Sequence, residues 1–394
     1  MMPSRRFERR CDNVRRIVFA LTASVLLSGC LLLPAATGDG FRWRVEPACE
    51  LIRPDEPGSQ SMGCIVWMSN DVYWAVTDWH PVVWELELPV DPASGKPQAC
   101  RLRKMCNPEG AVDVEGIVRD PLDGSIWLAD ERAGRIRRHD AVTGRGAEVI
   151  KLPPPMQNFY RDSGFESLTI SADGLTLWTC MEEALVPDGP RATRTQGTDV
   201  RLVRFVRKSA KDPWTVSGQW VYHTDPIEGG PWFNSKKKDL SRCGIAELCL
   251  LEDGTLLVLE REFSTVLFPR LRCRLYETDF SSATDVQGLA SISNAPALKK
   301  VEKKMLFETM GLSMYEGLCL GPKLSDGARL LVLVSDGDKR TFRSVMTLRL
   351  YPQAGLRRQV DRRRTPRDAD RHQLQPEEAQ PRHPRRRTGV GGVV

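Results

Sequence analysis

One hairpin pattern recurs along this chain. From Val112 to Glu131, two short apolar segments flank Asp123-Gly124, a dipeptide that accepts the positive φ angle of a tight turn. Related hairpins have their turns at Asn70-Asp71 (a degenerate copy), Asp173-Gly174, Asp253-Gly254 and Asp326-Gly327. Copies of one supersecondary unit in a single chain predict a repeat architecture, because each copy buries its apolar face against the next.

The segment 41–352 is typical of strands throughout, with no amphipathic helix longer than two turns, so we expect one all-β domain. Hairpins that are each followed by one or two further strands favour a β-propeller, in which four-stranded blades surround a channel. For the second copy, we expect strands near residues 114–119, 125–130, 134–139 and 147–152.

Acidic residues stand at the open end of every hairpin. Antiparallel pairing brings residues equidistant from a turn side by side, and the first strand of each propeller blade lines the channel. The acids should therefore converge as a ring at one mouth of the channel. The predicted ring, a set of candidate metal ligands, consists of Asp78, Glu115, Asp130, Glu131, Glu166, Glu182, Glu247, Glu260, Glu316 and Asp336.

So many carboxylates raise one another's pKa, and a bound cation would relieve their repulsion. Carboxylate oxygens suit Ca²⁺, or else Mg²⁺, better than zinc or copper. Arg132 and Arg261 each lie beside an acid of the ring, so the mouth could also hold a small anionic ester or phosphoester. The alternative is structural: the acids cap strand ends, pair with these cations and hold the blades together.

Three functions are compatible with such a mouth. The first is a metal-assisted hydrolase, in which Glu115, Glu166, Glu247 and Glu316 act as ligands or general base while Arg132 and Arg261 steady developing charge. The second is a lactonase-type propeller with one central Ca²⁺. The third is a binding scaffold without catalysis. A serine hydrolase is disfavoured because the sequence has no G-x-S-x-G motif.

The first 30 residues are typical of an export signal. Six arginines precede an apolar stretch, Ile17 to Leu27, that is too short for a membrane span. It ends in Leu-Ser-Gly-Cys30, which resembles the bacterial lipobox; an ordinary signal peptide is the alternative. The resemblance implies a lipid on Cys30 that tethers the protein to a membrane. We expect an exported lipoprotein at the periplasmic face of the outer membrane or at the cell surface, with residues 31–40 as a linker.

The last residues, 353–394, are rich in Arg and Pro and predict a disordered tail. The chain has a formal charge of +6, but this excess comes from its two ends. Residues 31–352 carry 40 basic and 44 acidic side chains, a charge of −4, so we expect no nucleic-acid binding by the folded domain.

Cysteines outside the signal segment fall into two groups. Four lie in apolar strand segments and are expected in the core: Cys64, Cys180, Cys249 and Cys319. Cys100 with Cys106, or Cys243 with a neighbour, are candidate disulfides in an oxidising compartment.

Four of the hairpins stand in an order that resembles a known family. The succession VEGIVRDPLDGSIWLADE, GFESLTISADGLTLWTCMEEAL, GIAELCLLEDGTLLVLERE and YEGLCLGPKLSDGARLLVLVSDGD is similar to the phytase-like family, described as having esterase-like activity. The resemblance covers residues 41–352 and implies a secreted or lipid-anchored bacterial propeller of six blades. The sixth blade would come from residues 184–240, or from Phe41–Val45 pairing with the C-terminal strand. Ser167 departs from the family pattern, in which Gly commonly follows Glu.

Overall fold

The computed structural model describes residues 41–353, except for Asp55, Trp79, 230–240, 265–269, Asn294, Pro296 and 338–341. The predicted signal segment with Cys30, the linker and nearly all of the predicted tail lie outside the described residues. No helix of the described part is long and apolar enough to cross a membrane.

Twenty strands of the described chain form five four-stranded antiparallel sheets, the blades of a β-propeller. Blade 1 contains β2 (Met62–Ser69), β3 (Val72–Thr77), β4 (Val83–Glu87) and β5 (Arg101–Cys106). Blade 2 contains β6 (Val114–Arg119), β7 (Ile126–Asp130), β8 (Arg135–His139) and β9 (Gly146–Val149). Blade 3 contains β10 (Phe165–Ile170), β11 (Thr176–Met181), β12 (Asp199–Val206) and β13 (Thr215–His223), preceded by the 3₁₀-helix η1 (Pro154–Gln157).

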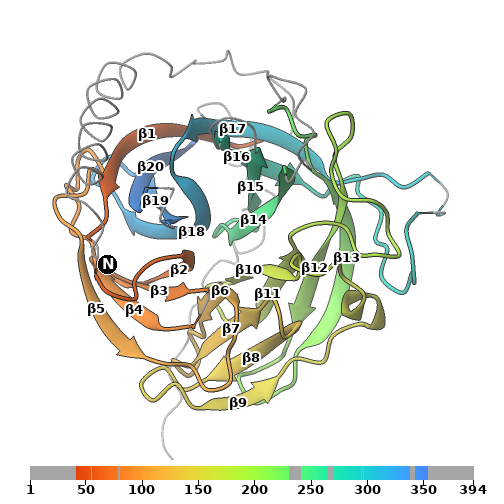
Figure 1. The fold of residues 1–394 in the computed structure, drawn as a ribbon, viewed down its shortest axis with the longest axis horizontal. Helices are drawn as coiled ribbons and strands as arrows, with labels where there is room; N and C mark the ends of the chain where they lie inside the picture. Colours follow the sequence, from red (N-terminus) through yellow and green to blue (C-terminus); the bar gives the residue numbers. More distant parts are fainter. Residues whose placement is uncertain are drawn as a thin grey trace, which may run out of the picture. The chain divides into compact units, whose positions relative to one another are not determined.

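Blade 4 contains β14 (Arg242–Leu250), β15 (Leu256–Ser264), β16 (Arg270–Asp279) and β17 (Glu302–Gly311). Blade 5 contains β18 (Met314–Lys323), β19 (Arg329–Asp336), β20 (Ser344–Pro352) and the N-terminal β1 (Trp43–Ile52). Figure 1 shows the blades around a common centre, with β2, β6, β10, β14 and β18 innermost.

The expectation of six blades is wrong, because the described chain builds five. Residues 184–240 hold no blade of their own in their described part; they supply β12 and β13, which complete blade 3. The predicted pairing of the N-terminal segment with the last strand does occur, with Trp43 opposite Pro352. It completes the fifth blade rather than a sixth, and so ties the two ends of the ring together.

The predicted hairpin turns have the expected backbone. Gly124, Gly174, Gly254 and Gly327 have φ angles of +77°, +70°, +86° and +88°, and Asn70 has +46°. A residue with a Cβ adopts this region at a cost, which explains the Asp-Gly pairs. The turns fix which residues pair, and therefore the register of the inner strands.

Apolar side chains fill the space between neighbouring blades. Strand β19, RLLVLVSD, is apolar on both faces because a blade packs on each side of it: Val332 meets residues of blade 1, while Leu331 meets residues of blade 4. Fully burying one such side chain contributes about 1.5–3 kcal/mol. Cys64, Cys180, Cys249 and Cys319 are buried as predicted, and the nine described cysteines are all free thiols.

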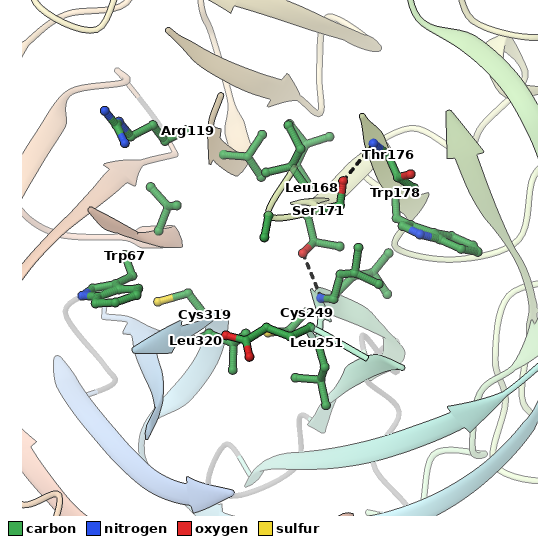
Figure 2. Close-up of a pocket in the computed structure, with 18 of the residues that line it drawn as sticks. Trp67, Arg119, Leu168, Ser171, Thr176, Trp178, Cys249, Leu251, Cys319 and Leu320 are labelled. Atoms are coloured by element: carbon green, nitrogen blue, oxygen red, sulfur yellow. Dashed lines mark hydrogen bonds between the residues drawn. The ribbon is translucent and has the colours of Figure 1, made fainter. Parts of the chain in front are cut away.

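The two ends of the channel differ in chemistry. All five inner strands begin at one end, where acidic residues gather, and finish at the other. At the far end a cavity of about 810 Å³ opens among apolar side chains of all five blades (Figure 2).

Candidate functional site

A β-bulge near the start of each inner strand leaves one residue without a partner in the adjacent strand. Those residues are Gly63, Glu115, Glu166, Ala246 and Glu316. At three of these positions the unpaired residue is a glutamate whose side chain lies among the charged groups at the end of the channel, whereas Ala246 packs in the core. Three of the five blades thus present a glutamate there.

The second strand of each blade adds another residue at this level. In each blade, the residue that precedes the bulge pairs with a residue of the second strand. The next residue along that second strand is Asp78, Glu131, Glu182, Arg261 or Asp336, in blade order. Successive residues of a strand face opposite sides, so these five share one orientation toward the channel end. Four are acids and the fifth is an arginine. We call these second-strand residues, with the three bulge glutamates and Asp113, the acid mouth.

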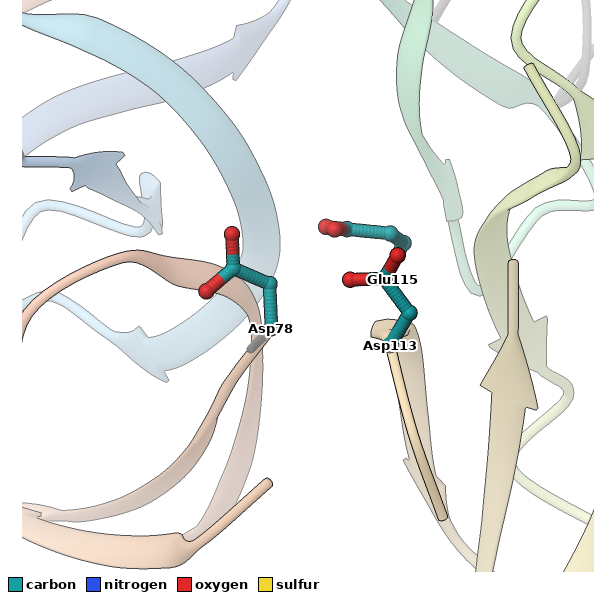
Figure 3. Close-up of side chains that lie close together, drawn as sticks. All are labelled: Asp78, Asp113 and Glu115. Atoms are coloured by element: carbon teal, nitrogen blue, oxygen red, sulfur yellow. The ribbon is translucent and has the colours of Figure 1, made fainter. Parts of the chain in front are cut away.

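Two groups of carboxylates within the acid mouth are close enough to share a cation. Asp78, Asp113 and Glu115 offer oxygens that all lie within 4.8 Å of one another, as do Glu131, Glu166 and Glu182. Figure 3 shows Asp78 of blade 1 facing Asp113 and Glu115 of blade 2. The first group therefore spans the junction of blades 1 and 2, and the second that of blades 2 and 3.

The pKa values reflect this crowding. Burial, and then neighbouring carboxylates, raise the pKa of Glu115 and Glu166 well above the ordinary value. Burial also raises the pKa of Glu316, against the opposing effect of Arg261. Burial and Glu182 raise the pKa of Glu131 to about 7. Carboxyl groups with raised pKa values bind protons more readily than exposed ones do, and a metal ion could take the place of those protons.

Arg261 is the counterion inside the acid mouth. Its Nη2 lies 2.7 Å from Glu182 Oε1, its Nη1 lies 2.7 Å from Glu316 Oε1, and Glu166 is 3.9 Å away. Burial alone would lower the pKa of Arg261, but Glu316 and Glu182 outweigh it and raise that pKa. Its charge is therefore committed to glutamates of blades 3 and 5.

Glycine makes room for one carboxylate. A Cβ on Gly63 would overlap Oε2 of Glu115, whose side chain occupies the space that blade 1 leaves open. On blade 3, the N–H of Gly164 donates to Glu131 Oε1 at 3.1 Å. Because Gly63 and Gly164 have no side chains, the carboxylates of Glu115 and Glu131 can lie against the backbone of the neighbouring blade.

Asp113 belongs to the site but was not predicted from the sequence. It immediately precedes β6, is 4% exposed, and lies 3.3 Å from Arg132 Nη2 through its Oδ2. Its Oδ1 is buried and has no hydrogen-bond partner among the described residues. A buried carboxylate oxygen without a partner is costly, so it is a candidate ligand atom. Arg132 itself is half-exposed at the rim.

Glu247 lies one residue beyond the bulge of β14, where Ala246 stands in its place. It accepts hydrogen bonds from Ser167 Oγ and, at 3.0 Å, from the N–H of Leu248. Burial raises the pKa of Glu247, although the hydrogen bond from Ser167 and those from nearby backbone N–H groups oppose the rise. Glu247 thus connects the inner strands of blades 3 and 4 below the acid mouth, with the hydroxyl of Ser167 as its partner on blade 3.

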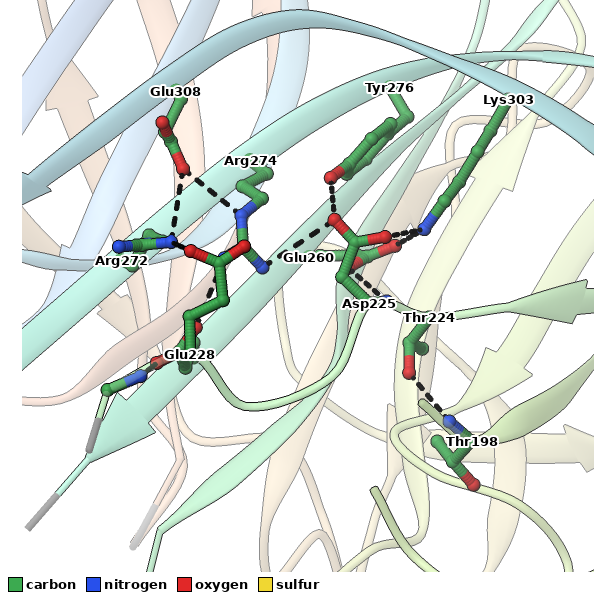
Figure 4. A network of polar contacts seen from close by, with 12 residues as sticks. Thr198, Thr224, Asp225, Glu228, Glu260, Arg272, Arg274, Tyr276, Lys303 and Glu308 are labelled. Carbon is green, nitrogen blue, oxygen red and sulfur yellow. Dashed lines mark hydrogen bonds and ion pairs between the residues drawn. The ribbon is translucent and has the colours of Figure 1, made fainter. Parts of the chain in front are cut away.

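Glu260 and Asp130 face away from the acid mouth, because each is the strand residue before one that faces it. In the network of Figure 4, Glu260 accepts a hydrogen bond from Lys303 Nζ at 2.6 Å. It also accepts one from Tyr222 Oη at 2.6 Å. Asp130 accepts from the N–H groups of Val112 at 3.0 Å and Ala133 at 2.9 Å, and so fixes the loop after β7.

Asp336 is the second-strand residue that blade 5 adds to the acid mouth, and its charge contributes to the raised pKa of Glu316. Of the ten predicted ring acids, seven lie at this end of the channel: Asp78, Glu115, Glu131, Glu166, Glu182, Glu316 and Asp336. Glu247, Glu260 and Asp130 do not.

Solved structures with a similar course of the chain include β-propeller domains, but the similarity is distant. The Nup133 β-propeller of Vanderwaltozyma polyspora is 8% identical over 74% of this chain and 71% of that chain, with a TM-score of 0.32. A luciferin-regenerating enzyme is 12% identical over 77% and 94% of the two chains, with a TM-score of 0.36. Kuenenia stuttgartiensis hydrazine synthase is 12% identical over 75% and 64%, with a TM-score of 0.29. Such values carry no argument about function.

No curated protein matches the chain. The sequence pattern of one family does match, over residues 60–339, which include all five inner strands and all nine residues of the acid mouth. That family is phytase-like and is described as "esterase-like activity of phytase". The protein is therefore a β-propeller of the phytase-like family.

Proposed function

We propose that this protein is a metal-assisted hydrolase of phosphoesters or other esters, with its reaction centre at the acid mouth. One observation carries the proposal: two groups of three carboxylates lie within 4.8 Å at adjoining blade junctions, and five of the six residues are buried. Arg261 balances only part of this charge. The family description, esterase-like activity of phytase, supports the same class of reaction.

The donor set fits a hard divalent cation, Ca²⁺ or else Mg²⁺. Every ligand atom is a carboxylate oxygen, and the Asp113 oxygen without a partner is available for coordination. Asp78, Asp113 and Glu115 would form one site, and Glu131, Glu166 and Glu182 the other. A cation bound there would polarise a phosphoryl or carbonyl oxygen and lower the pKa of a bound water.

The chain's own residues would then divide the remaining tasks. With a cation held by Asp78, Asp113 and Glu115, Glu131 would stand outside that ligand set and, with its pKa raised to about 7 in the metal-free protein, would accept a proton from the attacking water. Arg132, half-exposed at the rim, would orient the anionic group of a small substrate. Arg261 would hold Glu182 and Glu316 in place rather than contact the substrate, since both terminal nitrogens are already occupied.

Hydrolysis of p-nitrophenyl phosphate and p-nitrophenyl acetate, with Ca²⁺ or with EDTA, tests this function. Wild type should hydrolyse at least one ester only with the metal. Glu131→Gln should lose about 10²-fold or more, the usual contribution of a general base. Glu260→Gln is the matched control, because Glu260 faces away from the acid mouth. Full activity in EDTA, or equal losses in both variants, would contradict the proposal, and no hydrolysis of either ester would favour a binding scaffold.

We also propose that the protein is an exported lipoprotein tethered through Cys30, a residue outside the described part of the chain. The Leu-Ser-Gly-Cys30 sequence after an apolar stretch supports this location. In a Gram-negative host fed labelled palmitate, wild type should carry label in the membrane fraction. Cys30→Ala should lose the label, whereas Cys11→Ala should keep it. Unlabelled, soluble wild type would refute the tether.

A further inference from the structure

The cavity at the far end of the channel has the size of a small-molecule site. Its volume of about 810 Å³ lies within the range of roughly 300–1,000 Å³ that such sites usually have. Each blade contributes to its wall, for example Trp67, Ile117, Leu168, Leu251 and Leu320 in chain order. Figure 2 shows these inner-strand ends around an open centre.

The wall of this cavity is apolar and uncharged at depth. Trp67 and Trp178 stand on its sides (Figure 2). The thiols of Cys249 and Cys319 also line it, and burial raises the pKa of Cys249 to about 12 and that of Cys319 well above its ordinary value, so both remain neutral. An apolar ligand would bury its surface here without displacing charge.

The rim, in contrast, carries an excess of positive charge. Its ionised side chains are three arginines (Arg119, Arg204 and Arg329) and two acids (Asp173 and Glu252), which gives a formal charge of +1. Glu252 is paired with Arg329 at 3.1 Å, and Asp173 accepts hydrogen bonds from Ser171 Oγ and the N–H of Leu175 in its own turn. Arg329 therefore offsets the charge of Glu252, whereas Asp173 keeps its negative charge, and the excess at the rim comes from Arg119 and Arg204.

Two guanidinium groups at the rim have no carboxylate partner in the part of the chain that the structure describes. Among the described residues, no carboxylate oxygen lies within 4.0 Å of Arg119 or Arg204. Arg204 donates to Ser217 Oγ at 2.8 Å and lies over the rings of Trp178 and Trp220. Arg119 is exposed, and Figure 2 shows its side chain at the edge of the cavity, directed away from the centre.

We infer that this cavity binds a small amphipathic anion, an apolar body with a single carboxylate head, seated with the body among the inner-strand ends and the head at Arg119. The exposed side chain of Arg119 can turn over the head group, where it would form a charge-assisted hydrogen bond. Without a bound cation, the carboxylates of the acid mouth repel anions, so in the metal-free protein charge directs such a ligand to this end of the channel. The inference does not depend on the proposed hydrolase function.

Calorimetric titration of the full protein with sodium octanoate, in EDTA and at low salt, tests the inference. EDTA removes any metal at the acid mouth that could itself bind a carboxylate. Octanoate should bind at least tenfold more tightly than either of two control ligands. The first, 1-octanol, lacks the charge, and the second, acetate, lacks the apolar body. Arg119→Gln should weaken octanoate about tenfold or more, because it removes a charged hydrogen-bond donor.

Arg145→Gln is the matched control, since Arg145 is also exposed on blade 2 but lies on the turn between β8 and β9. It should leave octanoate binding unchanged. Leu320→Trp, which fills the cavity, should abolish binding while Arg119→Gln only weakens it. Equal affinity for octanoate and 1-octanol, equal losses in the two arginine variants, or no binding by wild type would each overturn the inference.

Discussion

Glu131 and Arg261 occupy equivalent positions on blades 2 and 4, yet they carry opposite charges. The arginine makes two short ion pairs across the acid mouth, whereas Glu131 has a pKa of about 7. Repulsion among the acids is therefore relieved unevenly: Arg261 offsets it at Glu182 and Glu316, whereas among the described residues neither Glu115 nor Glu131 forms an ion pair within 4.0 Å.

The raised pKa of Glu131 predicts how stability depends on pH. A carboxyl group whose pKa is higher in the folded state stabilises the fold fully below its unfolded pKa, and this contribution is lost as pH rises through its folded pKa. In EDTA, the free energy of unfolding should therefore fall between about pH 4.5 and 7, by up to about 3 kcal/mol from Glu131. Urea titrations at several pH values measure this slope.

Glu131→Gln is the control for this prediction. The buried imidazole of His139 has a lowered pKa and contributes the opposite slope below pH 6.5, but it does so equally in both proteins. The difference between wild type and Glu131→Gln thus isolates the carboxyl group. A difference that does not change between pH 4.5 and 7 would show that Glu131 titrates normally.

At the scale of the strand, the bulges and the glycines determine the site. Two glycines near the bulges have different neighbours. A Cβ on Gly116 would lie 2.8 Å from the backbone N of Leu168 and 2.9 Å from the backbone C of Ser167, which cannot move without shifting blade 3. A Cβ on Gly63 would meet only the flexible end of Glu115 at such close range.

These contacts predict opposite outcomes for two alanine substitutions. Gly116→Ala should destabilise the protein by about 1–3 kcal/mol, the usual cost of overpacking, because the clash is with backbone. Gly63→Ala should change stability by less than about 1 kcal/mol but displace Glu115 and weaken the response to Ca²⁺. Thermal unfolding with and without Ca²⁺ distinguishes the two effects. A large loss of stability in Gly63→Ala with its calcium response intact would contradict this account.

The hairpins could be predicted from the sequence because their signals are local. Asp-Gly turns and apolar segments stand within about twenty residues of each other, and the predicted strands of the second copy agree closely with β6 to β9. The bulges could not be predicted, since an extra residue in a strand has no sequence signal of its own. Glu247 was therefore aligned with the other glutamates, although the bulge residue of β14 is Ala246.

Glu260 and Asp130 were misplaced for a related reason. Glu260 precedes Arg261 and Asp130 precedes Glu131, and Arg261 and Glu131 do face the acid mouth. Neighbouring residues of a strand point to opposite sides, so an error of one position in the predicted register reverses the side on which an acid lies. Asp113 was missed because it stands before the strand, outside the repeated pattern of acids. Its position at the junction with blade 1 depends on contacts between blades, which the sequence of one hairpin does not specify.

At the scale of the whole molecule, closure of the ring depends on contacts distant in sequence. β1 pairs with β20 from Trp43 to Ile52 and completes blade 5. The family resemblance implied six blades, but no local pattern reveals whether the N-terminal strand completes an existing blade or adds one. The closed ring brings acids of blades 1, 2, 3 and 5 to one mouth and apolar strand ends to the other.

The central claim is that the acid mouth binds a divalent cation, and calcium-dependent stability tests it most directly. Ca²⁺ at a hundredfold excess over Kd should stabilise the metal-free protein by about 2.7 kcal/mol, or roughly 5 °C in Tm. Glu166→Gln should lose most of this response while its metal-free form is no less stable, because Glu166 is 3.9 Å from Arg261 and otherwise faces acids.

Glu182→Gln is the matched variant for that measurement, because Glu182 is a direct partner of Arg261 at 2.7 Å. It should lose the calcium response and also be less stable without metal, since it weakens a buried ion pair. The account predicts a rise in wild-type Tm with millimolar Ca²⁺ and none in Glu166→Gln. A wild-type Tm that is indifferent to Ca²⁺ and Mg²⁺, together with a metal-free Glu166→Gln less stable than wild type, would contradict it and make the acids structural.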